Sequence, residues 1–79
     1  MKYPAGTFLL ETTRGGMGWS ILRVEKALFS LSQHGVVVHI GNIYAPVYKG
    51  QKTAILRESR NYNYTVITEE EVVARMLSA

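Results

Sequence analysis

The residues best suited to molecular recognition are tyrosines and cations interspersed between residues 44 and 64. They are Tyr44, Tyr48, Lys49, Lys52, Arg57, Arg60, Tyr62 and Tyr64. Tyrosine and arginine are the side chains that most often anchor protein interfaces, and rings beside cations also suit stacking on bases with contacts to phosphate. We therefore expect a partner-binding surface here, for a protein or for a nucleic acid. The alternative, that these tyrosines only belong to half-buried strands, stays open.

A second segment combines glycines with one cation and one hydroxyl, and it precedes an expected helix. Its residues are Arg14, Gly15, Gly16, Gly18 and Ser20. The start of a helix after a glycine-rich approach exposes backbone N–H groups that can hold phosphate or carboxylate. The segment lacks the Walker A ending and the G-x-G-x-x-G spacing. An anion site is one interpretation, and a plain turn that needs positive φ angles is the other.

The sequence shows no set of residues suited to catalysis or metal binding. It has no cysteine and no aspartate, and its two histidines, His34 and His39, fall in separate expected elements. No turn typical of a nucleophilic serine is recognisable. The run Glu69–Glu71 is explained by its place at the start of a helix. We therefore expect a protein that is not an enzyme, with no metal and no cofactor.

Length and charge limit the classes of protein further. The 79 residues form a single domain, residues 1–79, with 47% hydrophobic and 19% charged residues. The net charge is +3, and it is uneven because the cations concentrate before residue 65. This favours an acidic partner or nucleic acid. No apolar run is long enough to span a membrane, and no signal peptide is apparent, so we expect a cytoplasmic protein.

The longest expected element is a helix over Trp19–His34. Its apolar residues repeat at the spacing of one helical face, with Ser20 as N-cap and Gly35 just after the end. On the opposite face, a polar stripe including Arg23 and Lys26 is expected to meet solvent. The alternative is a strand that begins at Trp19. The lone tryptophan is expected in the core in either case.

Strands account for most of the remaining chain, and their order predicts the fold class. The expected strands are Gly6–Thr13, Val36–Ile40, Ile43–Tyr48, Thr53–Glu58 and Tyr62–Ile67, with a hairpin turn at Lys49–Gln51. Pro46 assigns Ile43–Tyr48 to a sheet edge. Thr68 and Glu71 form a capping box that starts a second helix, whose apolar stripe includes Val72 and Met76. The predicted fold is α+β, in the order β-α-β-β-β-β-α, with a largely antiparallel sheet.

Together these features favour a non-enzymatic interaction protein that occludes a site on a larger, acidic protein or complex. In size, charge and lack of a catalytic set, the chain is similar to the accessory proteins that phages and mobile elements use to bind and block host machinery. Nucleic-acid binding and capture of a small anion at residues 15–20 are the alternatives. We also expect a homodimer, formed through the edge strand with Pro46 or through the C-terminal helix.

Overall fold

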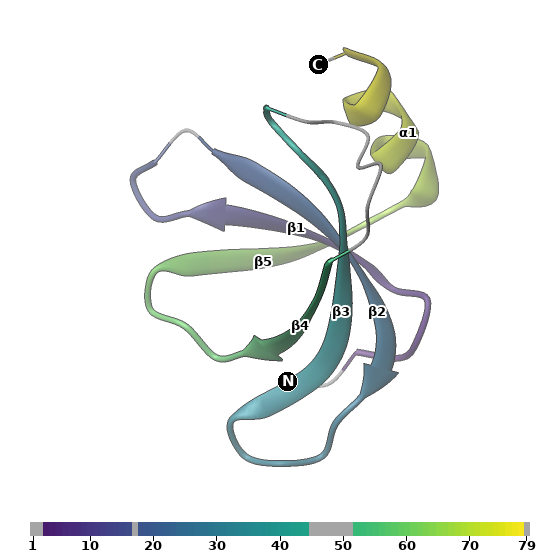
Figure 1. Ribbon diagram of the computed structural model, residues 1–79. Helices are drawn as coiled ribbons and strands as arrows, with labels where there is room; N and C mark the ends of the chain where they lie inside the picture. The colour runs from purple at the N-terminus through teal and green to yellow at the C-terminus, as the bar shows by residue number, and fades with distance from the viewer. Residues whose placement is uncertain (1–2, 17, 45–51, 79) are drawn as a thin grey trace.

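The computed structural model describes residues 3–16, 18–44 and 52–78, and it contains five strands followed by one helix (Figure 1). The strands are β1 (Phe8–Thr13), β2 (Trp19–Ala27), β3 (Gln33–Asn42), β4 (Lys52–Arg57) and β5 (Tyr62–Ile67), and the helix is α1 (Glu69–Ser78). All described pairings are antiparallel, and the strand order in the sheet is β4-β3-β2-β1-β5. The predicted α+β class with an antiparallel sheet is therefore confirmed, with one helix in place of two.

The sheet is strongly curled, because its two edge strands are neighbours in sequence. Only residues 58–61 connect β4 to β5, so the step from Arg57 to Tyr62 spans at most about 17 Å. A flat sheet would separate the two edges by about 19 Å, or four strand spacings. The curl brings Tyr64 of β5 and Leu56 of β4 onto the same buried cluster. The sheet therefore has a concave face that encloses a core and a convex face on the outside.

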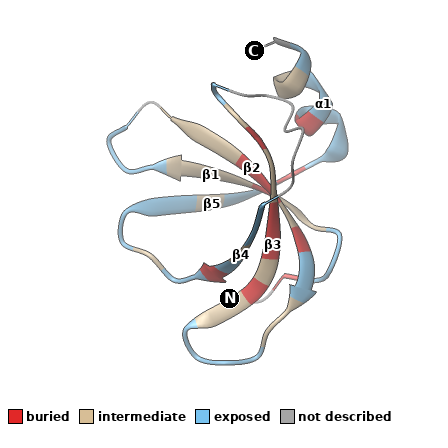
Figure 2. Ribbon diagram, in the orientation of Figure 1, coloured by how far each residue is buried: buried red, intermediate tan, exposed pale blue. Residues whose placement is uncertain are grey.

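The concave face holds the larger apolar cluster. Its buried members come from the N-terminal segment and four strands, and they are Tyr3, Leu9, Leu22, Val24, Val37 and Leu56. Leu9, Leu22, Val24 and Val37 are at most 1% exposed. Register shifts in the β2–β3 pairing add to the bend, since an unpaired extra residue increases local curvature. The buried residues follow the inner strands, as Figure 2 shows in red.

Helix α1 covers a second cluster on the convex face. Val72 packs there with Ile21 and Ile67, flanked by half-buried side chains that include Trp19 and Met76. Arg75 lies over the Trp19 ring, 5.7 Å from its centroid. The predicted helix start is confirmed, because the Glu71 N–H donates to Thr68 Oγ1 at 3.1 Å. Trp19, which was expected in the core, is partly buried and packs against this cluster.

The predicted helix over residues 19–34 is wrong. Residues 19–27 form β2 and residues 33–34 begin β3, so the alternative of a strand from Trp19 is the correct one. The apolar spacing misled because β2 is buried on both faces: Leu22 and Val24 join the concave cluster and Ile21 joins the convex one. Pairing with β1 and β3 satisfies the backbone hydrogen bonds of β2. These long-range pairings decide the structure here, in spite of the helical spacing of the apolar residues.

Gly35 serves a different purpose from the expected helix end. It lies within β3, where a Cβ atom would come within 3.0 Å of the Lys26 carbonyl oxygen. The glycine therefore allows β2 and β3 to approach closely beside the register shift. The polar stripe of the expected helix does not exist either, and Arg23 pairs with Glu25 along β2 instead, at 2.7 Å.

The other strand predictions are mostly confirmed. Val36–Ile40 lies within β3, and the last two predicted strands match β4 and β5 to within one residue at each end. In the predicted strand at residues 43–48, Ile43 and Tyr44 are not in a strand, and residues 45–48 lie outside the described residues, as does the turn at 49–51. Pro46, and with it the predicted edge strand, therefore lies outside the described part of the chain.

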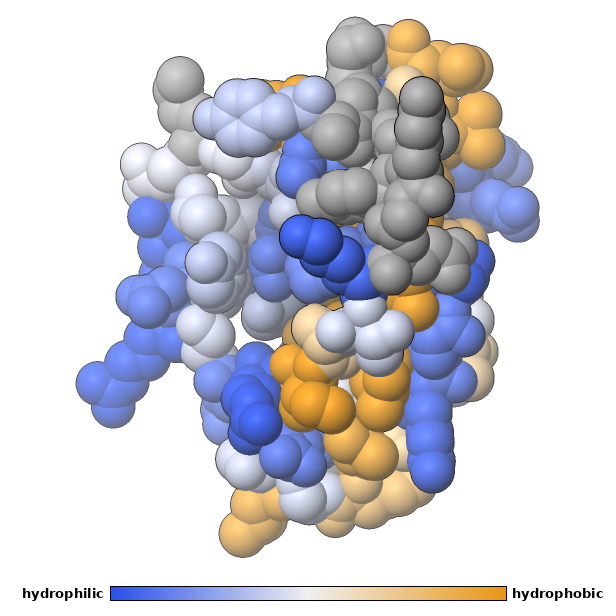
Figure 3. Space-filling view, viewed as in Figure 1, coloured by the Kyte–Doolittle hydropathy of each residue, from blue (hydrophilic) through white to orange (hydrophobic). Residues whose placement is uncertain are grey.

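The surface mixes apolar and polar side chains. The face drawn in Figure 3 has an apolar patch in its lower half, flanked by polar side chains on both sides. Large exposed apolar side chains include Phe29 and Leu31 in the β2–β3 turn and Ile55 on β4. No helix among the described residues has the length and apolar character needed to cross a membrane.

Candidate functional site

A row of polar side chains crosses the concave face beyond the apolar cluster. The ladders place Glu11 opposite Tyr64 on one side and opposite Ser20 on the other, and Ser20 opposite Asn42. Residues directly opposite in an antiparallel pair point to the same face. Glu11 lies two positions after Leu9, and Ser20 two positions before Leu22, so this row continues the concave core. The concave face is thus apolar at one end and polar at the other.

Tyr64 fixes the carboxylate in this row. Its hydroxyl donates to Glu11 Oε2 at 2.9 Å, in a partly buried position. Burial raises the pKa of Tyr64 above its ordinary value, and the hydrogen bond to Glu11 together with the negative charge of that carboxylate raises this pKa further. The phenol therefore stays protonated and keeps one carboxylate oxygen occupied.

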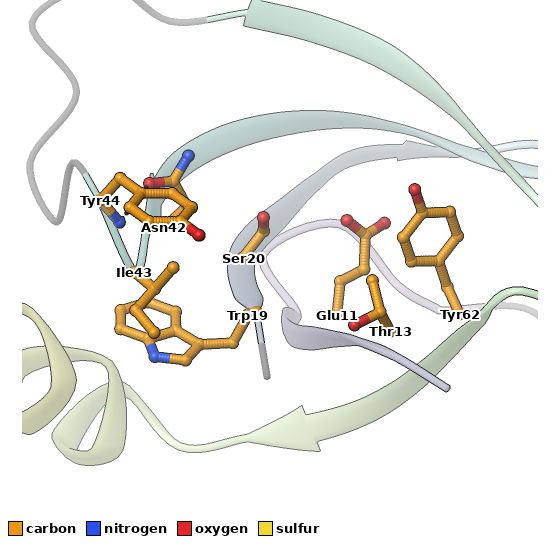
Figure 4. Close-up of a pocket in the computed structure, with 9 residues that line it drawn as sticks. Glu11, Thr13, Trp19, Ser20, Asn42, Ile43, Tyr44 and Tyr62 are labelled. Carbon is orange, nitrogen blue, oxygen red and sulfur yellow. Dashed lines mark hydrogen bonds between the residues drawn. The ribbon is translucent and has the colours of Figure 1, made fainter. Parts of the chain in front are cut away.

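A pocket of about 210 Å³ opens above this row, and we call it the polar pocket. Its lining residues are Glu11, Thr13, Gly18, Trp19, Ser20, Asn42, Ile43, Tyr44 and Tyr62. In Figure 4 the Glu11 carboxylate and the hydroxyls of Ser20 and Tyr62 point to the same side, and Tyr44 extends over Asn42 at the other end. The Tyr44 N–H donates to Asn42 Oδ1 at 2.8 Å, which fixes the amide at that end.

A second recess, which we call the arginine groove, lies between three turns. It is lined by Arg14, Ser32, Glu58, Ser59 and Arg60 and has a volume of about 560 Å³. The β1–β2 and β4–β5 turns are joined here, since the Arg14 N–H donates to the Asn61 carbonyl oxygen at 3.0 Å. The Asn61 N–H in turn donates to Ser59 Oγ at 3.1 Å. Short, hydrogen-bonded turns thus place two exposed arginines, Arg14 and Arg60, in the lining of one groove.

The predicted partner-binding residues divide among these places. Tyr44 and Tyr62 line the polar pocket, and Arg60 lines the arginine groove. Arg57 and Tyr64 line a neighbouring recess between β4 and β5. Lys52 lies at the opposite end of β4 from Arg57, about 17 Å along the strand. Tyr48 and Lys49 lie outside the described residues. Tyr62 also lines that neighbouring recess, and Glu58 and Ser59 line both it and the arginine groove.

The residues of the proposed anion loop divide as well. Arg14 lines the arginine groove, whereas Gly18 and Ser20 line the polar pocket. Because β2 begins at Trp19, no helix starts here to orient N–H groups toward an anion. Gly15 has a φ of 68°, so the need for positive φ in this turn is real. Gly16 is packed against Thr13, whose Oγ1 a Cβ atom would strike.

Sequence reasoning missed two residues of the polar pocket, Glu11 and Asn42. Glu11 lies at a strand position where alternation after Leu9 would call for an inward-facing apolar residue. Asn42 lies opposite Ser20, beyond a register shift in the β2–β3 pairing, so alternation along β3 does not predict its place. The signal for Glu11 lies within the predicted strand Gly6–Thr13, since Glu11 follows Leu9 by two positions. The predicted helix over residues 19–34 hides only its pairing with Ser20. No cluster of three or more His, Cys or acidic side chains suited to a metal ion occurs among the described residues.

Comparisons with protein-family models, with curated proteins and with solved structures found no significant match for this chain.

Proposed function

We propose that the chain is a non-catalytic binding domain that holds an acidic segment of a larger protein in the arginine groove. The observation that carries this proposal is the placement of Arg14 and Arg60 in one groove, on two turns that are hydrogen-bonded to each other. Within the described residues neither arginine makes an ion pair, because the two ion pairs there belong to Arg23 and Arg75. A guanidinium held in this way offers a planar fork of donors to a carboxylate.

The surroundings of the groove favour a protein over a nucleic acid. Ser32 belongs to the β2–β3 turn, where Phe29 is 85% exposed and Leu31 is 98% exposed. Apolar side chains beside arginine are typical of protein interfaces. Glu58 also lines the groove, and its charge would repel a continuous phosphate backbone. Nucleic-acid binding remains the alternative, and the experiment below separates the two.

The proposal extends to what binding would achieve. A small domain that attaches to a larger complex through one end can occlude a site there, as the similarity in kind to phage and mobile-element accessory proteins suggests. We include in the proposal a cytoplasmic setting and self-association through α1. Val73 and Leu77 of that helix are 51% and 81% exposed and are available for such a contact.

The experiment compares labelled probes of equal charge by fluorescence anisotropy. One probe is a glutamate-rich peptide that contains leucine, and the other is a single-stranded oligonucleotide. The double variant Arg14→Ala/Arg60→Ala is expected to bind the peptide about tenfold more weakly, since exposed charge-assisted contacts contribute about 0.5–1 kcal/mol each. The matched control, Lys26→Ala/Lys52→Ala, removes the same charge from exposed positions elsewhere.

The control variant is expected to retain the peptide affinity. Equal losses of peptide affinity in the two double variants would mean that net charge alone attracts the peptide. The groove would then have no role in binding. Tighter binding of the oligonucleotide, with an affinity that falls steeply with salt, would support the nucleic-acid alternative.

A further inference from the structure

Within the described part of the chain, the carboxylate of the polar pocket has no cationic partner. Glu11 is half-buried, and its partner is the neutral Tyr64 hydroxyl, at 2.9 Å. Among the residues that the structure describes, the lining of the pocket contains no lysine, arginine or histidine. Elsewhere in the described residues the ion-paired glutamates are Glu25 and Glu71, each with an arginine on its own element. A partly desolvated carboxylate favours a positive group beside it.

The walls of the pocket supply what a positive group needs besides charge. Ser20 and Thr13 have hydroxyl oxygens that can accept hydrogen bonds, and an ammonium group has three donors and no acceptor. Tyr44 and Tyr62 contribute rings, whose faces attract cations. In Figure 4 the carboxylate lies beside Tyr62, and the row of polar atoms leads from there toward Asn42.

The size of the pocket sets the scale of the ligand. A volume of about 210 Å³ is below the range of about 300–1,000 Å³ typical of drug-sized ligands. It suits one compact head group on a short alkyl chain. Trp19 and Ile43 provide apolar contact for such a chain at the lower side of the pocket, where their side chains meet in Figure 4.

We propose that the polar pocket binds a primary alkylammonium group, with the Glu11 carboxylate as its counter-ion. The ammonium would donate to Glu11 and to the neighbouring hydroxyls, while Tyr62 borders it with its ring. Tyr64 is a positioning residue, because it holds the carboxylate without lining the pocket. The site differs from the arginine groove in both residues and charge, so it does not depend on the function proposed above. The ammonium can come from a lysine side chain of a protein or from a free amine.

Amide NMR titration with n-butylammonium chloride tests the proposal directly. We expect saturable shifts at Glu11, Ser20 and Asn42, which sodium chloride at the same ionic strength does not reproduce. Sodium butyrate and n-butanol test whether the charge matters, since both keep the alkyl chain. Saturation by either of these at the same amides, or no saturable shift with n-butylammonium, would overturn the proposal.

The variant Glu11→Gln removes the charge and leaves an amide oxygen to accept from Tyr64. It is expected to weaken n-butylammonium binding at least about tenfold, as expected for loss of one partly buried charge-assisted contact. Glu70→Gln, which removes the same charge from an exposed position on α1, should bind as the unaltered protein does. If Glu11→Gln proves unfolded in its own spectrum, the ligand series on the unaltered protein still decides the proposal.

Two short peptides then identify the source of the ammonium group. One is an alanine tripeptide with a central lysine, acetylated at its N-terminus and amidated at its C-terminus so that lysine supplies the one ammonium group, and the other has norleucine at that position. Tighter binding of the lysine peptide than of n-butylammonium would assign the pocket to a protein side chain. Equal or weaker binding would assign it to a free amine, and both results support an ammonium site provided that the norleucine peptide fails to bind.

Discussion

Replacing Tyr64 with phenylalanine tests the hydrogen bond that organises the concave polar row. The change removes the hydroxyl that donates to Glu11 Oε2 and leaves the ring in place. A hydrogen bond to a charged acceptor contributes about 1.5–3 kcal/mol. Because the polar pocket is open to water that can replace the lost donor, we expect a loss of about 1 kcal/mol at neutral pH. For a domain of this size, that loss lowers the melting temperature by about 4–8 °C.

The pH dependence makes this prediction specific. The folded-state pKa of Tyr64 lies above its ordinary value of 10.0, so its contribution to stability is complete below pH 10 and is lost as pH rises. Above that pH the unfolded phenol ionises while the folded one does not, which costs about 1.4 kcal/mol per pH unit. The stability difference between the unaltered protein and Tyr64→Phe should therefore close by about pH 11.

Chemical denaturation followed by circular dichroism, at several pH values between 7 and 11, measures this difference. Burial raises the pKa of Tyr3 too, but Tyr3 is present in both proteins, so its effect cancels in the comparison. The control is Tyr44→Phe, because that side chain is 90% exposed and should leave the stability unchanged. A stability difference that stays constant up to pH 11, or no difference at any pH, would refute the reasoning.

Two further predictions concern local structure. Thr68→Ala removes the acceptor for the Glu71 N–H at the start of α1 and should destabilise the domain by about 1 kcal/mol in thermal denaturation. Its control, Ser32→Ala in the exposed β2–β3 turn, removes a hydroxyl elsewhere and should leave the melting temperature unchanged. Gly15→Ala should cost about 1 kcal/mol because Gly15 has a φ of 68°, while Gly18→Ala should cost less, since no atom lies within 4 Å of its added Cβ and its φ is not positive. A melting temperature of Thr68→Ala equal to that of the unaltered protein would contradict the first prediction. Equal melting temperatures for Gly15→Ala and Gly18→Ala would contradict the second.

Local signals in the sequence were reliable wherever the structure is decided by neighbours along the chain. The capping box at Thr68 and the alternation over Tyr62–Ile67 predicted α1 and β5 correctly, because helix caps and strand alternation depend on residues a few positions apart. The short β-branched run at Val36–Ile40 was likewise sufficient to identify β3. These predictions needed no knowledge of what packs against each element.

The assignment at residues 19–34 failed because the deciding interactions lie far away in the sequence. Ile21 and Leu22 face opposite sides of a sheet, and each side is buried by a different partner. A strand buried on both faces loses its alternation and can match a helical spacing by chance. The wrong helix prediction also affects the candidate site. The sequence predicts Ser20 as a helix cap, whereas Ser20 lies on the concave face opposite Glu11.

By itself the sequence determined a small α+β domain with an uneven positive charge and with tyrosines and arginines in its second half. Only the tertiary structure decided which of these residues meet. The pairing of β1 with β5 places Arg14 and Arg60 on one groove and puts Tyr64 directly opposite Glu11. The physical reason is that strand pairing joins residues separated by tens of positions, and no local pattern records which strand will lie beside which.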